Sequence, residues 1–387
     1  MGTYISKADT SVALLYLSVT AFFGGTVFYK ARKKKMEKAN TFVCGLLLLS
    51  LEILCFAMLR SYAGLLLFSG ACLISYICLP VRSMLPVDNK AVLITGSDSG
   101  IGHALAKHLD NLGFVVFAGV LNKEGPGAEA LKRSCSQRLS VLQLDITNPT
   151  QIREGSVCKV HPLSWLQCGL WGIVNNAGVL GFLADGELLP MSIYRQCMDV
   201  NFFGAVEVSK TFLPLLRKSQ GRLVNMSSMA GGVPMPRLAA YSASKAALSM
   251  FSGVMRQELS KWGIKVAVVH PSGFRTCRYL TFQLVENHQS RWRTDYGEDY
   301  ILALKNFLLH MPSFCGSDLS PLLDDVLDAL LAKSPHGLYT PGKNAYLALC
   351  IFCYFPLWFY DFFIGKSLCV KILPRALRAS ESKSKNT

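Results

Sequence analysis

A short apolar run followed by a glycine-rich turn is the feature that most constrains the fold of this 387-residue chain. Residues 91–95 (AVLIT) have the continuous apolar character of a buried parallel strand. Gly96, Gly100 and Gly102 follow and lead into a helical stretch. Glycine permits a tight turn, and the amino terminus of a helix offers free N–H groups to an anion. The segment therefore predicts a dinucleotide-binding strand–turn–helix unit.

The same alternation of strand and helix continues along the chain. Apolar runs predict further strands over residues 114–120, 141–145, 172–178 and 221–228. Strands that alternate with helices predict an α/β fold, here a Rossmann-like doubly wound parallel sheet with helices on both faces. Ligands of such sheets bind outside the carboxyl ends of the strands, so the residues that follow each strand are the candidates for a cofactor site.

An acid within the glycine turn decides which dinucleotide we expect. Asp98 can accept hydrogen bonds from ribose hydroxyls and would repel a 2′-phosphate, which favours NAD over NADP. The alternative interpretation is that Asp98 only caps the helix that follows. The predicted cofactor-binding residues are Gly96, Asp98, Ser99, Gly100, Ile101, Gly102, Asp145, Asn176, Ala177, Gly178, Tyr241, Lys245, Gly273 and Thr276.

A tyrosine and a lysine four residues apart form the candidate catalytic pair. Tyr241 and Lys245 lie on one face of a predicted helix, and a nearby ammonium lowers the pKa of a phenol. Tyr241 is therefore a candidate general acid/base. A helix-surface pair without catalytic meaning is the alternative. Ser227 and Ser228 end the preceding strand and place hydroxyls at the same edge of the sheet.

The order of these motifs carries a resemblance. A glycine turn, NNAG at 175–178, Asn201, Ser228 and YxxxK from Tyr241 to Lys245 follow one another as in the short-chain dehydrogenase/reductase family, which residues 90–274 resemble. The resemblance implies that Tyr241 is the acid/base, that Lys245 tunes its pKa and binds ribose, that Ser228 holds the substrate oxygen, and that Asn201 positions a relay water.

One departure from the family pattern affects the predicted nicotinamide contacts. The family usually has Pro-Gly where this chain has Pro271 and Ser272, so contacts to the nicotinamide are expected from Gly273 and Thr276 instead. Residues 276–310 are predicted to form the substrate loop. A catalytically silent, lipid-binding scaffold on this fold is the alternative of another class.

Within the family the chain is similar to membrane-bound hydroxysteroid dehydrogenases, in LPVDNKAVLITG, NNAGVLGF and ELSKWGIKVA. That similarity implies oxidation of a 17β-hydroxysteroid, such as estradiol or testosterone, to the 17-ketosteroid with NAD. Retinol and 11β-hydroxysteroids are the alternative substrates. The similarity also implies an endoplasmic-reticulum membrane protein, and a homodimer is a compatible assembly.

Three apolar stretches, 11–29, 41–59 and 61–79, predict a membrane anchor over residues 1–82 with one to three transmembrane helices. Six cations between residues 30 and 38 place that loop in the cytosol. The domain over 83–343 is expected in the cytosol too, if the second and third stretches both cross or neither does; it would face the lumen if one of them crosses alone. Residues 344–387 are predicted to be an aromatic membrane-interface segment and a basic tail. Lys383 and Lys385 resemble a dilysine retrieval signal, or are a solvated basic tail.

The charge distribution argues against a nucleic-acid partner. The net charge is +15, but the basic excess flanks the apolar segments at both ends of the chain and does not accumulate on the predicted folded domain. Cys350 and Cys353 form a CxxC inside an apolar aromatic stretch without neighbouring ligands, which predicts packing and not a metal site.

Overall fold

The computed structural model of the protein describes residues 7–34, 45, 48–55, 62–78, 83–157, 169–275, 294–310, 315–342, 344–368 and 373–378. The chain divides into two compact units, one of residues 1–85 with 332–334 and one of residues 86–331 with 335–387. The helices and strands are α1 (Lys7–Lys34), α3 (Tyr62–Cys78), β1 (Ala91–Ile94), α4 (Gly100–Asn111), β2 (Val115–Val120), α5 (Pro126–Ser134), β3 (Leu139–Gln143), α6 (Pro149–Val157), β4 (Gly172–Asn175), η1 (Gly186–Leu188), α8 (Met191–Met198), η2 (Asp199–Gly204), α9 (Ala205–Ser219), β5 (Arg222–Met226), η3 (Met229–Gly231), α10 (Ala239–Glu258), η4 (Leu259–Trp262), β6 (Lys265–Val269), α12 (Glu298–His310), α13 (Ser320–Leu331), β7 (Leu338–Tyr339), α14 (Ala345–Tyr354) and α15 (Leu357–Leu368).

The larger unit is built on a seven-stranded parallel sheet with the strand order β3-β2-β1-β4-β5-β6-β7. Because the chain runs outward from β1 in one direction and then from β4 in the other, the sheet has a switch point between these two strands. Open parallel sheets bind ligands at such a point. Each predicted strand is present, and β4 ends at Asn175, so that residues 176–178 lie beyond its carboxyl end.

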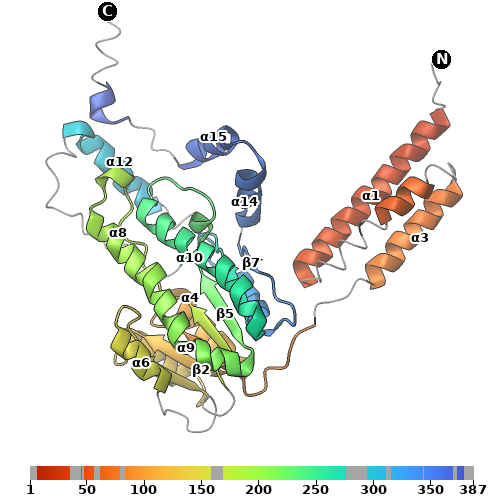
Figure 1. Ribbon diagram of the computed structural model, residues 1–387. Coiled ribbons are helices and arrows are strands. Elements are labelled where there is room, and N and C mark those ends of the chain that lie inside the picture. Colours follow the sequence, from red (N-terminus) through yellow and green to blue (C-terminus); the bar gives the residue numbers. More distant parts are fainter. Residues whose placement is uncertain are drawn as a thin grey trace, which may run out of the picture. The chain divides into compact units, whose positions relative to one another are not determined.

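Helices cover both faces of the sheet, as the strand and helix alternation predicts (Figure 1). Leucines of α4, α5 and α13 pack on one face and form a core with the inward residues of β1, β2 and β5. On the other face α6 and α9 contribute Ile152, Val208, Phe212 and Leu216 to a second core. The strands are apolar on both sides because both sides are covered. The doubly wound α/β fold is therefore confirmed.

The smaller unit holds α1 and α3, joined through a cluster that includes Tyr16, Phe68 and Cys72. The rings of Tyr16 and Phe68 are 5.8 Å apart between their centroids. In the described part of the chain, no helix has both the length and the apolar character that crossing a bilayer requires. The predicted transmembrane helices therefore receive no support from these residues; α3, for example, has 17 residues, against roughly 20 for a span.

Candidate active site

The turn between β1 and α4 is as tight as its glycines predict. Gly96 and Gly100 have φ angles of +68° and +60°, a left-handed region that favours glycine. A Cβ on Gly102 would lie 2.2 Å from the Gly96 carbonyl oxygen and 2.4 Å from Nδ2 of Asn176. Ser99, the N-cap of α4, makes no side-chain hydrogen bond to the first turn. The turn therefore presents backbone N–H groups of a helix amino terminus at the edge of the sheet.

Asn176 and a threonine that sequence reasoning missed hold this turn in place. Nδ2 of Asn176 donates to the carbonyl oxygens of Thr95, at 2.9 Å, and Gly96, at 3.1 Å. The Thr95 hydroxyl accepts the backbone N–H groups of Asn176 and Ala177, each at 3.0 Å. A hydroxyl at the end of the strand before the glycine turn is the signal that could have identified Thr95. The side-chain amide of Asn176 thus holds the backbone of the glycine turn in place.

Asp98 lies at the carboxyl end of β2 and does not cap α4. Its carboxylate accepts the backbone N–H of Leu121 through both oxygens, at 2.9 and 3.1 Å. The helix-capping interpretation is therefore wrong, since Ser99 occupies the N-cap position. The end of the second strand is where dinucleotide folds place the group that meets the ribose hydroxyls. Here the carboxylate at this end of β2 is that of Asp98, which comes from the glycine turn.

These residues line a cavity of about 340 Å³ at the switch point of the sheet. Its polar lining residues include Asp98, Asp145 and Asn176. Its apolar lining residues include Leu121, Leu144 and Val200. Oδ1 of Asp145 accepts the backbone N–H and the hydroxyl of Thr147, at 2.9 and 2.7 Å. Of the predicted cofactor residues, those that line it are Gly96, Asp98, Ser99, Gly100, Ile101, Asp145, Asn176, Ala177 and Gly178. A glycine cradle with carboxylates and apolar walls fits a dinucleotide.

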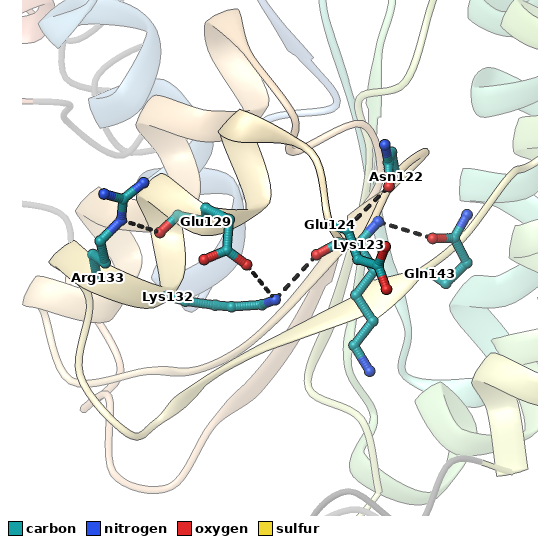
Figure 2. A network of polar contacts seen from close by, with 7 residues as sticks. All are labelled: Asn122, Lys123, Glu124, Glu129, Lys132, Arg133 and Gln143. Atoms are coloured by element: carbon teal, nitrogen blue, oxygen red, sulfur yellow. Dashed lines mark hydrogen bonds and ion pairs between the residues drawn. The ribbon is translucent and has the colours of Figure 1, made fainter.

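Lys123, which follows the lining residue Leu121 by two positions, and Lys132 belong to a network of polar contacts (Figure 2), and neither of them lines the cavity. Nζ of Lys132 donates to the Glu129 carboxylate at 2.8 Å and to the Lys123 carbonyl oxygen at 3.1 Å. The backbone N–H of Lys123 donates to Oε1 of Gln143 at 2.9 Å. The residues that line the cavity include two acids and neither lysine nor arginine.

A second cavity, of about 510 Å³, shares Ile101, Asn176, Gly178 and Val179 with the first. The two therefore form one continuous groove. Predicted site residues that line the second cavity include Ser228, Tyr241, Lys245 and Gly273. Apolar residues of its wall are Leu180, Leu183, Met229, Met235, Leu238 and Phe274.

Tyr241 and Ser228 are hydrogen-bonded to each other in this cavity. Burial raises the pKa of the Tyr241 phenol, and the hydrogen bond from Ser228 opposes that rise. The predicted lowering of this pKa by Lys245 stays a prediction. Nζ of Lys245 lies 5.9 Å from the centroid of the tyrosine ring and donates to the Met226 carbonyl oxygen at 2.8 Å. Burial in turn lowers the pKa of Lys245 to about 8.

The two adjacent serines have different surroundings. The Ser227 hydroxyl donates to the Lys245 carbonyl oxygen at 2.9 Å and lies 2.8 Å from the Ser249 hydroxyl, so it faces α10. Oγ of Ser228 accepts the backbone N–H of Ala230 at 3.1 Å and bonds Tyr241. Ser228 is therefore the serine that can meet a substrate oxygen together with the tyrosine.

Asn201 lies in the π-helical turn η2, and its side chain is fully engaged. Its Oδ1 accepts the Val179 N–H at 2.7 Å, and its Nδ2 donates to the Val179 carbonyl oxygen and to the Ser244 hydroxyl at 2.8 and 2.9 Å. The side chain thus ties the segment after β4 to α10. Its role in positioning a relay water stays a prediction.

The loop after β6 departs from the family pattern and is held from several sides. The Ser272 N–H donates to the Pro341 carbonyl oxygen at 3.0 Å, and the Gly316 N–H to that of Gly273 at 2.9 Å. Gly273 lines the substrate cavity as predicted. Thr276 lies outside the described residues, as do residues 276–293 of the predicted substrate loop; the described part of that loop contains α12.

A buried histidine behind the loop was also missed by sequence reasoning. Nε2 of His270 lies 2.9 Å from the Ser249 hydroxyl, which donates to the Lys245 carbonyl oxygen at 2.8 Å. Burial lowers the pKa of His270 to about 4, so the ring is neutral at physiological pH. A histidine directly before the loop gave no periodic signal that could have identified this contact.

The chemistry that these residues can perform is proton transfer at an oxygen atom. The hydroxyls of Tyr241 and Ser228 converge in an otherwise largely apolar cavity. A nicotinamide dinucleotide bound in the groove supplies hydride transfer at the neighbouring carbon. The residues of this chain would orient the alcohol, exclude water and move its hydroxyl proton.

Comparison with known proteins agrees with this arrangement. The family model described as short chain dehydrogenase matches residues 90–280. The chain is 52% identical over 396 residues to human 17-beta-hydroxysteroid dehydrogenase type 2, and the alignment covers 100% of both proteins. It is 46% identical over 306 residues to bovine 11-beta-hydroxysteroid dehydrogenase type 2, covering 77% of this chain and 75% of that protein.

Solved structures show the same fold at lower identity. The short chain dehydrogenase from Burkholderia cenocepacia J2315, solved in complex with NADP, has a TM-score of 0.54 at 22% identity and covers 72% of this chain and 99% of that one. The fold alone follows from that likeness, whereas the match to the human relative extends over every part of the chain. This protein therefore belongs to the short-chain dehydrogenase family of oxidoreductases.

Proposed function

We propose that the protein oxidises 17β-hydroxysteroids, such as estradiol and testosterone, to 17-ketosteroids with NAD. The observation that carries this proposal is the 52% identity over the full length to human 17-beta-hydroxysteroid dehydrogenase type 2. The cavity around Tyr241 supports it, because its wall of leucine, methionine and phenylalanine side chains suits a rigid apolar ring system.

In the proposed reaction the steroid hydroxyl lies between Ser228 and Tyr241. Ser228 donates to or accepts from the hydroxyl oxygen and keeps the reacting carbon at a fixed place. Tyr241, as the phenolate, would take the hydroxyl proton and later release it to solvent, and a bound nicotinamide dinucleotide would supply the acceptor for the hydride of the same carbon. The hydrogen bond from Ser228 stabilises the phenolate against burial. Lys245 is proposed to bind the ribose of the dinucleotide.

A substrate panel tests the proposal. Purified membrane protein is assayed with estradiol, testosterone, cortisol and retinol, with Tyr241→Phe as the background. We expect kcat/KM for the two 17β-hydroxysteroids to exceed that for the other alcohols by at least about tenfold. The second candidate is 11β-hydroxysteroid oxidation, which the 46% identity to the bovine 11-beta-hydroxysteroid dehydrogenase type 2 favours. Preference for cortisol or retinol would contradict the 17β assignment.

The choice of NAD rests on the charges around the first cavity. Two carboxylates, of Asp98 and Asp145, line it without a lysine or arginine, and a 2′-phosphate would meet repulsion there. Asp98→Asn keeps an acceptor for the Leu121 N–H and removes the charge. We expect the ratio of kcat/KM with NAD to that with NADP to fall about tenfold. Asp318→Asn, an acid that lines neither cavity, should leave the ratio unchanged; an unchanged ratio in both variants would contradict the role of Asp98.

Residues 1–82 are proposed to attach the protein to the endoplasmic-reticulum membrane with the catalytic unit in the cytosol. On α1 and α3, large apolar side chains are exposed, among them Phe22 at 76%, Leu66 at 74% and Ile77 at 69%. Apolar surface of this extent needs a partner or lipid. Protease treatment of sealed microsomes should digest the catalytic unit, and a protected carboxyl terminus would contradict this orientation.

A further inference from the structure

Three segments that are distant in sequence meet at a polar cluster beside the substrate cavity. Tyr300 of α12 donates its hydroxyl hydrogen to Oδ2 of Asp185, before η1, at 2.6 Å. The Arg237 guanidinium, from the loop that leads into α10, is hydrogen-bonded to the same tyrosine hydroxyl. Arg237 is 8% exposed and Tyr300 is 7% exposed, whereas Asp185 is half-buried, so two of the three side chains are largely removed from water.

The backbone of Arg237 is also unusual. Its φ angle is +67°, a left-handed conformation that residues with a side chain rarely adopt. Such conformations persist where surrounding contacts hold them, and they are frequent at ligand sites. Arg237 lines the substrate cavity and stands four residues before Tyr241. The left-handed turn therefore lies where the cavity wall becomes the catalytic helix.

The helix that carries Tyr300 also packs against this wall. Leu304 of α12 belongs to an apolar cluster with Leu183 and Ala240, and Leu238 packs against that cluster. Leu183 and Leu238 line the substrate cavity. Leu304 of α12 thus belongs to an apolar cluster that includes side chains lining the substrate cavity.

We propose that Asp185, Arg237 and Tyr300 form a latch that holds α12 against the substrate cavity and thereby sets the affinity for the alcohol substrate. They are positioning residues, since they act through the cavity wall and not on the reacting atoms. The proposal rests on the proposed function only in its choice of a steroid as the probe.

The chemistry of the latch explains why it would be strong. Hydrogen bonds that involve a charged group gain strength in a buried site, and each lost partner leaves a buried charge unsatisfied. Burial raises the pKa of Tyr300 to about 12, so the phenol keeps the proton that it donates to Asp185 across the physiological range. Displacement of α12 would separate the phenol from a carboxylate and a guanidinium at once.

A neighbouring tyrosine provides a matched control. Tyr296 also donates to a carboxylate, that of Glu187, but this contact is exposed. The rings of Tyr296 and Tyr300 lie 5.0 Å apart between their centroids. Tyr296→Phe and Tyr300→Phe therefore remove the same chemical group from adjacent rings, one at the surface and one in the latch.

The first experiment is steady-state kinetics of the full-chain protein with estradiol and NAD. For Tyr300→Phe we expect KM for the steroid to rise about tenfold, with kcat and the dissociation constant of NAD changed by less than about twofold. For Tyr296→Phe we expect all three values to stay within about twofold of wild type. Because the same bond is broken, Arg237→Met combined with Tyr300→Phe should raise KM by less than the product of the single effects.

A second readout separates the latch from the identity of the substrate. Hydrogen–deuterium exchange of residues 294–310 should be about fivefold or more faster in Tyr300→Phe than in Tyr296→Phe. If wild type fails to oxidise estradiol, the proposed function is wrong and the exchange rates still decide the latch. Equal exchange in the two variants would overturn the latch, as would a fall in kcat for Tyr300→Phe with KM unchanged.

Discussion

The two cavities of the groove are built from different kinds of structure. The dinucleotide cavity is formed by the glycine turn and by residues that directly follow β3 and β4, so backbone geometry determines most of its shape. The substrate cavity shares the segment after β4 and takes most of its other walls from residues within 226–238 and 271–274 and from α10. The shape of the dinucleotide cavity thus depends mainly on the sheet, whereas the shape of the substrate cavity depends more on how loops pack.

Their electrostatics differ in the same way. Carboxylates of Asp98 and Asp145 face the dinucleotide cavity, whereas the substrate cavity contains the amine of Lys245 and the guanidinium of Arg237. Burial lowers the pKa of that amine to about 8, so desolvation competes with its charge. The comparison teaches that the glycine-turn end of the groove and the proton-transfer end carry different charges, with Lys245 proposed to serve both, so mutations remote from Lys245 should affect one half of the groove more than the other.

The largest expected effect belongs to Tyr241. Tyr241→Phe removes the hydroxyl that bonds Ser228 and leaves the ring that lines the cavity. We expect kcat to fall about 1,000-fold, equivalent to about 4 kcal/mol, because general acid/base groups contribute factors of this order. Fluorescence titration should give a dissociation constant for NADH within about threefold of wild type.

Ser228→Ala provides the comparison for this prediction, since it removes the partner of the phenol and leaves the phenol itself. A kcat loss smaller than that of Tyr241→Phe would fit a supporting role. If Tyr241→Phe weakened NADH binding as strongly as it lowered kcat, the two halves of the groove would not act separately.

The second effect concerns His270, which stands behind the substrate half. Burial lowers its pKa from 6.5 to about 4, so between these pH values the unfolded chain binds more protons than the folded chain. Stability is therefore complete above pH 6.5 and is lost as the pH falls through about 4, by about 3 kcal/mol from this group. His270→Gln should remove that dependence.

Urea unfolding of wild type and His270→Gln at pH values from 4 to 7 measures this difference. The free energy of unfolding of the variant should change with pH by about 3 kcal/mol less than that of wild type over this range. NADH binding at pH 7 should not change, because His270 lines neither cavity. Parallel pH curves for the two proteins would contradict the assignment.

The same contrast explains what could be predicted from the sequence. The glycine turn lies within one strand–turn–helix unit, and local residue types determine such a unit, so the sheet and the dinucleotide cavity follow from the sequence. Residue type alone is compatible with Asp98 as a helix cap or as a ribose ligand. The decisive contact is with Leu121, 23 residues further along, and spacing within the turn could not reveal it.

The substrate half was less predictable, because its properties depend on burial and on loops. Four-residue spacing places Lys245 beside Tyr241, but it does not show that the ammonium turns toward the Met226 carbonyl oxygen or that burial raises the pKa of the phenol. Tyr300 lies in the predicted substrate loop, but its contact with Arg237 is not predictable, because a left-handed turn and a helix some sixty residues later bring the two together. No local sequence pattern predicts the contact between Arg237 and Tyr300.

The smallest effect in this comparison belongs to the dinucleotide half. A Cβ on Gly102 would meet backbone of Gly96 at 2.2 Å, whereas a Cβ on Gly253 of α10 would meet nothing within 4 Å. Gly102→Ala must therefore shift the glycine turn, and we expect the dissociation constant of NADH to rise about 30-fold, equivalent to about 2 kcal/mol. Gly253→Ala should leave it unchanged and slightly stabilise the helix that carries Tyr241.

With saturating dinucleotide, Gly102→Ala should keep kcat within about threefold of wild type. If kcat fell with affinity even at saturation, the turn would also determine how the two halves of the groove align, and the halves would not be independent.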